Sequence, residues 1–350
     1  KGVECYERTK ENALVTQPWS TGITLQVLPK TNVDQIPILA PGYGFSPMSD
    51  GKTFQWAFNP PASYWDGMSM ILQEISGGDL SSLAGKKIAH LHLDHPYGKE
   101  PLPLLEAMGE EHGFEVLPIP VGISEMQNQS AQWLQIRRES PDFVIMWGWG
   151  AMNAGAITEA VKTRYPMDQF VGVWWSGHSD DLQLVGEDGK GYRAISWSLP
   201  NPDAPVMAAI AEHVGDKSLA DAEEKGEVFY GRGVIISAIL AEGIAQAQAM
   251  HETAEISAAQ LRDGLANLNF TQERIDELGL TGMMAPFATS CADHTGHSGG
   301  WMIEWDGTKF VQASDLLTAD RDAIEPLEAE KAAEYASANA PWPLNEACDG

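Results

Sequence analysis

The sequence predicts an α/β protein built on parallel sheets, and three observations support this fold class. Short apolar runs alternate with stretches of helical length along most of the chain, which is the order expected of βαβ units. The runs FVIMW at 143–147 and FVGVWW at 170–175 are almost wholly apolar, as strands buried on both faces are. With 350 residues, the chain is also long enough for two domains, each with its own core.

The predicted elements alternate regularly as far as residue 198. We expect strands at 11–22, 36–44, 86–94, 115–121, 141–150 and 169–177. Between them we expect helices at 23–32, 64–76, 99–113, 127–140 and 151–165.

The regular alternation of strands and helices ends after residue 198. A proline-rich connection at 198–205 precedes a long apolar helix at 227–250 and a polar helix at 257–268. Asp306-Gly307, between two alternating runs at 299–317, predicts a β-hairpin. An acidic, solvated helix is expected at 323–341.

The charge balance excludes one class of function. The chain has 49 Asp and Glu against 22 Lys and Arg, for a net charge of −27. Such a surface repels phosphates and anionic lipids, so we expect no nucleic-acid partner. No apolar run approaches the ~20 residues of a membrane-spanning helix, and we expect no direct membrane insertion.

The three cysteines indicate a disulfide. Cys291 and Cys348 both lie in the last quarter of the chain, without the C-x-x-C spacing of a zinc site. We predict that they form a disulfide, which suggests an oxidising compartment. Cys5 is then either a buried thiol or half of a bridge whose partner lies outside this chain.

The order of these stretches resembles a known family, the type I periplasmic solute-binding proteins of ABC importers, in the branched-chain amino acid (Leu/Ile/Val-binding, HAAT) group. The stretches that carry the resemblance run in the family's order over nearly the whole chain: KGVECYERTKENALVTQPWSTG, IPILAPGYG, KKIAHLHLDHPYGKEPLPLLE, SPDFVIMWGWGAMN, DQFVGVWWSG and VFYGRGVIISAILAEGI.

This resemblance implies two doubly wound lobes joined by a hinge, with the ligand cleft between them. Lobe 1 would comprise 1–58 and 200–284, and lobe 2 would comprise 59–199 and 285–350. Family members carry further N-terminal strands of lobe 1 before the GVECYER helix. We expect that these strands exist in the native protein and could hold the partner of Cys5.

Several candidate site residues follow strands, where ligands bind in doubly wound sheets. The family binds a ligand carboxylate at the turn that matches Trp19-Ser20-Thr21-Gly22, although the same residues also fit a plain helix N-cap. We assign Trp149 to the site and Trp147 to the core. Together with further matching positions, the candidate ligand-binding residues are Trp19, Ser20, Thr21, Tyr43, Gly44, His95, Tyr97, Trp149, Trp175, Ser176 and Tyr230.

The sequence departs from the amino-acid binders at one point. Relatives that bind amino acids place a carboxylate after the FVG strand, to pair with the ligand's ammonium. Here that stretch reads Val173-Trp-Trp-Ser-Gly-His178, and the first acid is Asp180. Because an unpaired buried ammonium costs several kcal/mol, we expect a carboxylic acid with an apolar or aromatic body.

An alternative function comes from His90-Leu-His92-Leu-Asp94-His95, which resembles the H-x-H-x-D-H motif of zinc-dependent hydrolases of the metallo-β-lactamase type. His90 and His92 lie two apart in an apolar strand pattern and therefore share one face of it. A zinc site would need them in the loop that follows. We therefore favour structural histidines, with no bound metal, and keep His95 as a ligand contact.

The resemblance as a whole implies a protein that is not an enzyme and has no catalytic residues or cofactor. Its partners would be a small-molecule ligand and the membrane-bound permease subunits of an ABC importer. We expect a periplasmic monomer that captures its ligand by hinge closure.

Overall fold

The computed structural model describes residues 1–213 and 227–348, so residues 214–226 and 349–350, inside the predicted ranges 200–284 and 285–350, lie outside the described part. The helices are α1 (Gly2–Thr9), α2 (Thr21–Asp34), α3 (Tyr64–Ile75), α4 (Pro96–Lys99), α5 (Leu102–His112), α6 (Ser130–Glu139), α7 (Ala151–Thr163), α8 (Pro205–His213), α10 (Val228–His251), α11 (Ala258–Leu265), α12 (Gln272–Glu277) and α13 (Arg321–Ala338). The strands are β1 (Ile38–Leu39), β2 (Ala57–Phe58), β3 (Lys87–Leu93), β4 (Glu115–Val121), β5 (Phe143–Trp147), β6 (Phe170–Gly172), β7 (Arg193–Ser196), β8 (Asn269–Phe270), β9 (Phe287–Ala288), β10 (Trp301–Trp305) and β11 (Phe310–Gln312).

The largest sheet has seven strands in the order β11-β10-β7-β6-β5-β3-β4. Strands β3 to β7 are parallel, and the predicted hairpin of β10 and β11 adds two antiparallel strands at the edge. From β3 the chain moves outward to β4 and then returns past β3 to β5. The sheet therefore reverses its winding between β3 and β5, which is a topological switch point of a doubly wound fold.

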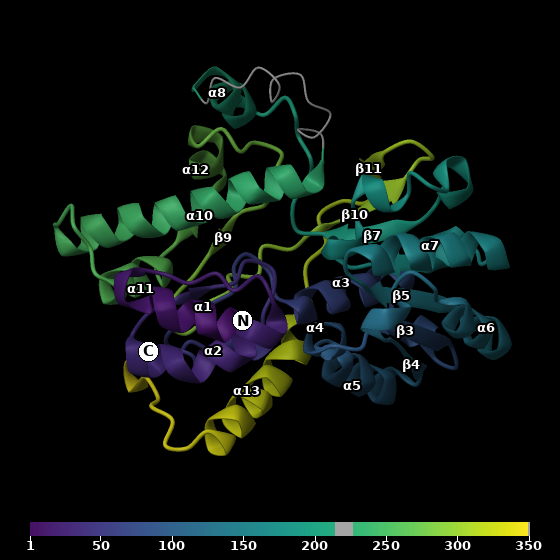
Figure 1. Cartoon of the computed structure of the whole chain (residues 1–350), viewed down its shortest axis with the longest axis horizontal. Coiled ribbons are helices and arrows are strands. Elements are labelled where there is room, and N and C mark those ends of the chain that lie inside the picture. The colour runs from purple at the N-terminus through teal and green to yellow at the C-terminus, as the bar shows by residue number, and fades with distance from the viewer. Residues whose placement is uncertain (214–226, 349–350) are drawn as a thin grey trace.

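Helices cover both faces of this sheet. α3 packs with α5, and α6 packs with α7 (Figure 1). Because parallel crossovers are right-handed, the reversal after β4 places α6 and α7 on the face opposite α5. Both faces are covered, which explains why β3 and β5 are buried along almost their whole length.

The remaining elements form a second α/β body, on the left of Figure 1. It holds α1, α2, the parallel pair β1–β2, α10 to α12 and the antiparallel pair β8–β9. The strand predicted at 11–22 is wrong, since only Thr16 pairs, through a single bridge to Ile38. Pro18 has no N–H to donate, and Trp19 adopts a positive φ of 50° that turns the chain out of the sheet.

Helix α10 is long and apolar enough to cross a membrane by length and composition alone. The search of the sequence for an apolar run of ~20 residues did not predict such a helix. In the fold, α10 packs closely on α11, because a Cβ on Gly264 would meet the Gly243 carbonyl oxygen at 2.1 Å. The helix buries Ile235 and Ile239 completely. In all, 39% of its most apolar 18-residue window is buried in the fold.

The C-terminal segment packs against residues 46–56. Trp342 donates from Nε1 to the Thr53 carbonyl oxygen at 2.7 Å, and the rings of Tyr335 and Phe54 lie 5.2 Å apart. Helix α13 is less solvated than expected, because Glu328 is buried. The lobe boundaries predicted from the sequence remain a prediction, and these contacts favour grouping the tail after α13 with the first segment of the chain.

The predicted disulfide between Cys291 and Cys348 is confirmed. Cys5 is exposed and has no disulfide partner in the described ranges. The alternative of a buried thiol at Cys5 is therefore wrong.

Candidate ligand-binding site

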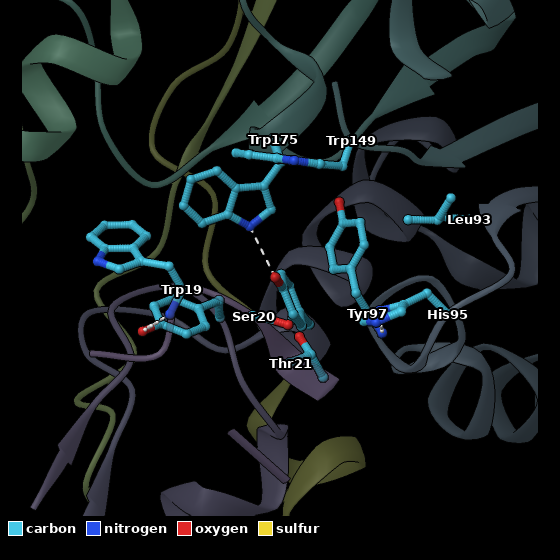
Figure 2. A pocket seen from close by; sticks show the side chains of 10 residues that line it. Trp19, Ser20, Thr21, Leu93, His95, Tyr97, Trp149 and Trp175 are labelled. Carbon is cyan, nitrogen blue, oxygen red and sulfur yellow. Dashed lines mark hydrogen bonds between the residues drawn. The ribbon is translucent and has the colours of Figure 1, made fainter. Parts of the chain in front are cut away.

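A cavity of about 270 Å³ lies between the second body and the switch point of the large sheet (Figure 2). Its volume lies just below the range of about 300–1,000 Å³ that is usual for ligand pockets. The lining residues are Trp19, Ser20, Thr21, Tyr43, Tyr64, Leu93, His95, Tyr97, Trp149 and Trp175. Eight of the eleven residues predicted from the sequence are therefore brought together around one space.

The ends of three neighbouring strands build one wall of the cavity. Leu93 ends β3, and His95 and Tyr97 follow it at the start of α4. Trp149 follows β5, and Trp175 lies in a 3-10 turn after β6, at Trp174–Ser176. The sequence pattern predicted that strand at 169–177, but the regular pairing ends at Gly172. Because β3 and β5 flank the switch point, their loops diverge and leave a crevice between them.

The N-terminus of α2 forms the opposite wall. Ser20 is the N-cap residue, and its Oγ accepts a hydrogen bond from Ile23 N at 3.4 Å. The Thr21 hydroxyl lies near the Tyr64 hydroxyl, yet its buried Oγ1 makes no standard hydrogen bond with any described residue. The first turn of a 14-residue helix and the Thr21 hydroxyl thus face the same cavity. Both favour an anionic ligand group.

Trp19 adopts a conformation that is rare for a bulky side chain. Its φ is 50°, in the left-handed region. The centroids of the stacked Trp19 and Tyr43 rings lie 5.4 Å apart, and the backbone N–H of Trp19 donates to Tyr43 Oη at 3.0 Å. The side chain is nevertheless 53% exposed, so the fold holds a large apolar ring at the cavity mouth.

Buried hydroxyl groups fix the remaining aromatic rings. Trp175 donates from Nε1 to Tyr64 Oη at 2.9 Å (Figure 2). Tyr97 donates from Oη to the Gly148 carbonyl oxygen at 2.8 Å. Burial raises the pKa of both tyrosines well above the ordinary value of 10. Both hydroxyls therefore stay protonated and can act as neutral hydrogen-bonding groups.

The lining carries almost no charge. None of its ten residues is Asp, Glu, Lys or Arg. His95 Nδ1 accepts from Tyr97 N at 3.3 Å, and burial lowers the pKa of His95 below its ordinary value. His95 is therefore neutral at pH 7, with its proton on Nε2. The described lining holds no anionic partner for a ligand ammonium.

Three predicted residues lie elsewhere. Gly44 is buried against Met48, and the Ser176 hydroxyl is buried and donates to the Gly148 carbonyl oxygen at 3.2 Å. Tyr230 lines a separate apolar groove formed by α8, α10 and residues 278–280.

Tyr64 and Leu93 line the cavity although the sequence analysis missed them. Leu93 is the last residue of β3, so its place at a strand end could have found it. Tyr64 begins α3, which follows no strand of the large sheet, so the strand-end rule could not predict it.

The zinc alternative is not supported. His90 and His92 are buried on β3 with their rings stacked at 4.9 Å, and His90 Nε2 donates to the Gly98 carbonyl oxygen at 2.8 Å. Asp94 pairs with Lys99 at 2.6 Å. Throughout residues 1–213 and 227–348, no group of three or more His, Cys, Asp or Glu side chains could hold a metal ion.

Two α/β bodies with a ligand-sized cavity between their strand ends and helix N-termini define the class of two-lobed solute-binding proteins. The chain belongs to the periplasmic binding protein family, whose model matches residues 3–309. Its fold is the type I periplasmic binding fold, α/β with a mostly parallel central sheet. Proteins of this family bind small solutes for ABC transporters and are not enzymes, and the family points to a place outside the cytoplasm.

Solved structures agree with this assignment. The chain is 31% identical to a protein described as an ABC transporter permease from the Pseudomonas fluorescens group, with a TM-score of 0.89 over 99% of this chain and 85% of that one. It is 19% identical to a branched-chain amino acid ABC transporter protein from Thermus thermophilus with bound valine, with a TM-score of 0.76 over 92% and 84%.

A third similar structure is a solute-binding protein from R. palustris in complex with benzoate. It shares 18% identity and a TM-score of 0.68 over 91% of this chain and 82% of that one. At these lower identities the likeness shows the fold alone. No curated protein sequence matches this chain significantly.

Proposed function

We propose that the protein captures a small carboxylic acid with an apolar or aromatic body for uptake through an ABC importer. The observation that carries this proposal is the buried Thr21 hydroxyl at the N-terminus of α2, whose Oγ1 lies near Tyr64 but makes no hydrogen bond of standard geometry with a described residue. A carboxylate seated there would accept a hydrogen bond from Thr21 and interact favourably with the helix dipole. The tryptophan and tyrosine rings of the lining would surround its apolar body.

One feature weighs against a Leu/Ile/Val-type amino acid. The ten lining residues include no carboxylate, so a ligand ammonium would be buried unpaired, which is costly. Relatives of the same fold differ in ligand: the protein from Thermus thermophilus holds valine, whereas others are the benzoate-bound protein from R. palustris and a fatty acid ABC transporter substrate-binding protein from Thermomonospora curvata. The fold thus accommodates carboxylates without an ammonium group.

In this proposal the protein acts in the periplasm as a monomer, catalyses no reaction and needs no cofactor. Ligand contacts from both bodies stabilise a closed state that the permease subunits recognise. Hinge closure requires a lining drawn from both bodies, and this cavity has one, with Trp19 before α2 and Trp175 after β6.

The test is a binding panel read by thermal shift and titration calorimetry: benzoate, phenylacetate, hexanoate, leucine and valine. We expect the wild type to bind at least one of the three simple acids more tightly than either amino acid. Thr21→Val should weaken binding of that acid about tenfold or more, because it removes a hydrogen bond to a charged group. Thr163→Val on α7, whose hydroxyl bonds only within its own helix, serves as the control. Binding of leucine or valine alone would refute the proposal.

A further inference from the structure

A buried positive charge lies directly behind the cavity wall. Arg232, on α10, is only 2% exposed. Its guanidinium donates from Nη1 to the Trp174 carbonyl oxygen at 2.9 Å, from Nη2 to Ser196 Oγ at 3.1 Å and from Nε to Ser198 Oγ at 3.2 Å. All three acceptors are neutral.

Aromatic rings enclose the guanidinium. Its Cζ lies 5.1 Å from the ring centroid of Trp175, 5.0 Å from that of Trp197 and 5.2 Å from that of Phe229. These distances are within the range of cation–π contacts, which strengthen when the cation is removed from water. Burial lowers the pKa of Arg232 to about 9, so the group remains positively charged at pH 7.

No opposite charge accompanies Arg232 in the described part of the chain. None of the ion pairs among the described residues includes Arg232. Glu227, which lies just before α10, pairs with His178 at 3.5 Å. A buried cation without an anionic partner is unusual, because desolvation is then uncompensated. Trp175 has Arg232 near its ring and also lines the cavity. A ligand anion in the cavity would thus be a nearby opposite charge.

We propose that Arg232 determines ligand specificity: its charge, acting across the Trp175 wall, favours monoanionic carboxylates and disfavours ligands that carry an ammonium group. This inference rests on the proposed function and deepens it. Arg232 does not line the cavity, so its charge acts through space in a region of low dielectric. A preference on the order of tenfold between a carboxylate and its neutral amide is the expected scale of this effect.

Arg232 also positions the wall itself. Its bond to the Trp174 carbonyl oxygen holds the 3-10 turn that carries Trp175. This positioning should act on neutral and anionic ligands alike, whereas the charge should act on the anion alone. The ratio of the two affinities therefore separates the charge from the positioning.

The experiment measures the affinity of two acids and of their primary amides, benzoate against benzamide and phenylacetate against phenylacetamide, by calorimetry at pH 7. We expect the wild type to favour the acid, Arg232→Met to lower the acid-to-amide ratio about tenfold, and Arg232→Lys to retain most of the ratio while weakening both ligands. Arg274→Met, which removes a charge from α12 that pairs with Glu242, should leave the ratio unchanged. If Arg232→Met does not fold, Ser198→Asp places a carboxylate beside Nε and should lower the ratio in the same way.

The outcomes separate this inference from the function on which it rests. A wild type that prefers the acid, with Arg232→Met or Ser198→Asp keeping that preference, overturns the role of Arg232 and leaves the proposed function standing. A wild type that binds the amides as tightly as the acids, or binds leucine or valine instead, overturns both.

Discussion

At the scale of single residues, the structure holds two buried carboxylates in opposite states. Burial alone would raise the pKa of Asp66, but His297 at 2.8 Å and Arg321 at 3.0 Å hold it well below its ordinary range. Glu100 has no such cation, and burial raises its pKa to about 8. Its Oε1 accepts from Ser46 N at 2.7 Å, while its buried Oε2 has no partner in the described chain. Glu100 is therefore protonated at neutral pH, and Asp66 is charged.

Glu100 should make stability depend on pH. Because its folded pKa lies above the ordinary value of 4.5, its stabilising contribution is complete below about pH 4.5 and is lost as pH rises toward 8. The slope is at most about 1.4 kcal/mol per pH unit. Glu100→Gln should therefore raise the melting temperature at pH 8 relative to the wild type and flatten the profile between pH 5 and 8. Calorimetry over this range checks it, with exposed Glu334→Gln as control. Parallel profiles for the wild type and Glu100→Gln would contradict the prediction.

At the scale of elements, the C-terminal segment shows how distant parts of the chain stabilise one another. Helix α13 packs against the 3-10 turn Ser46–Ser49 and against α3. The chain beyond α13 is then fastened by the disulfide from Cys348 to Cys291, across 57 residues of sequence. A cross-link over a loop of this length restricts the unfolded chain and should stabilise the fold.

Removing this disulfide should lower the free energy of unfolding by about 2–4 kcal/mol. The double variant Cys291→Ser/Cys348→Ser tests this, with guanidinium unfolding followed by circular dichroism. Cys5→Ser is the matched control, because Cys5 is exposed and unpaired among the described residues, and its midpoint should not change. An equal loss in both proteins, or none in the double variant, would show that the bridge does not stabilise the fold.

At the scale of the whole molecule, the two bodies contact each other directly around the cavity. Trp174, after β6, donates from Nε1 to the Gly42 carbonyl oxygen at 2.8 Å, after β1. His95 approaches Gly22 so closely that a Cβ there would lie 2.9 Å from Cε1. Under the proposed hinge mechanism, contacts of this kind would be lost when the two bodies separate, so they would favour the closed, ligand-binding arrangement.

Trp174→Phe should therefore weaken ligand binding about three- to tenfold, since it removes one hydrogen bond across the cleft. It should also enlarge the radius of gyration measured by small-angle X-ray scattering at subsaturating ligand. Trp305→Phe is the control: its Nε1 also donates to a carbonyl oxygen, that of Gly186, at 2.8 Å, but away from the cavity. The control should lower stability without a specific effect on affinity. Equal losses of affinity in both variants would show that the cross-cleft bond does not favour closure.

The elements and most of the site could be predicted from the sequence because their causes are local. Apolar runs bounded by turn residues mark the strands of the large sheet, and Asp306-Gly307 marks the hairpin. In a doubly wound sheet the site lies at the strand ends, and the resemblance to the solute-binding family added the matching positions, so His95, Tyr97 and Trp149 could be proposed before any contact was known. The strand expected at 11–22 failed because pairing requires a neighbour along its length, which a local pattern does not report.

The sequence by itself determined the class of fold, the disulfide and the loops that meet at the cavity. Only the tertiary structure decided which side chains enter it: Tyr64 lines it from α3, while Ser176 turns into the core. It also placed Arg232 behind Trp175 without an opposite charge in the described chain. The physical reason is that side-chain direction and electrostatic pairing depend on elements far apart in sequence, such as α10 and the turn after β6, and packing alone brings these together.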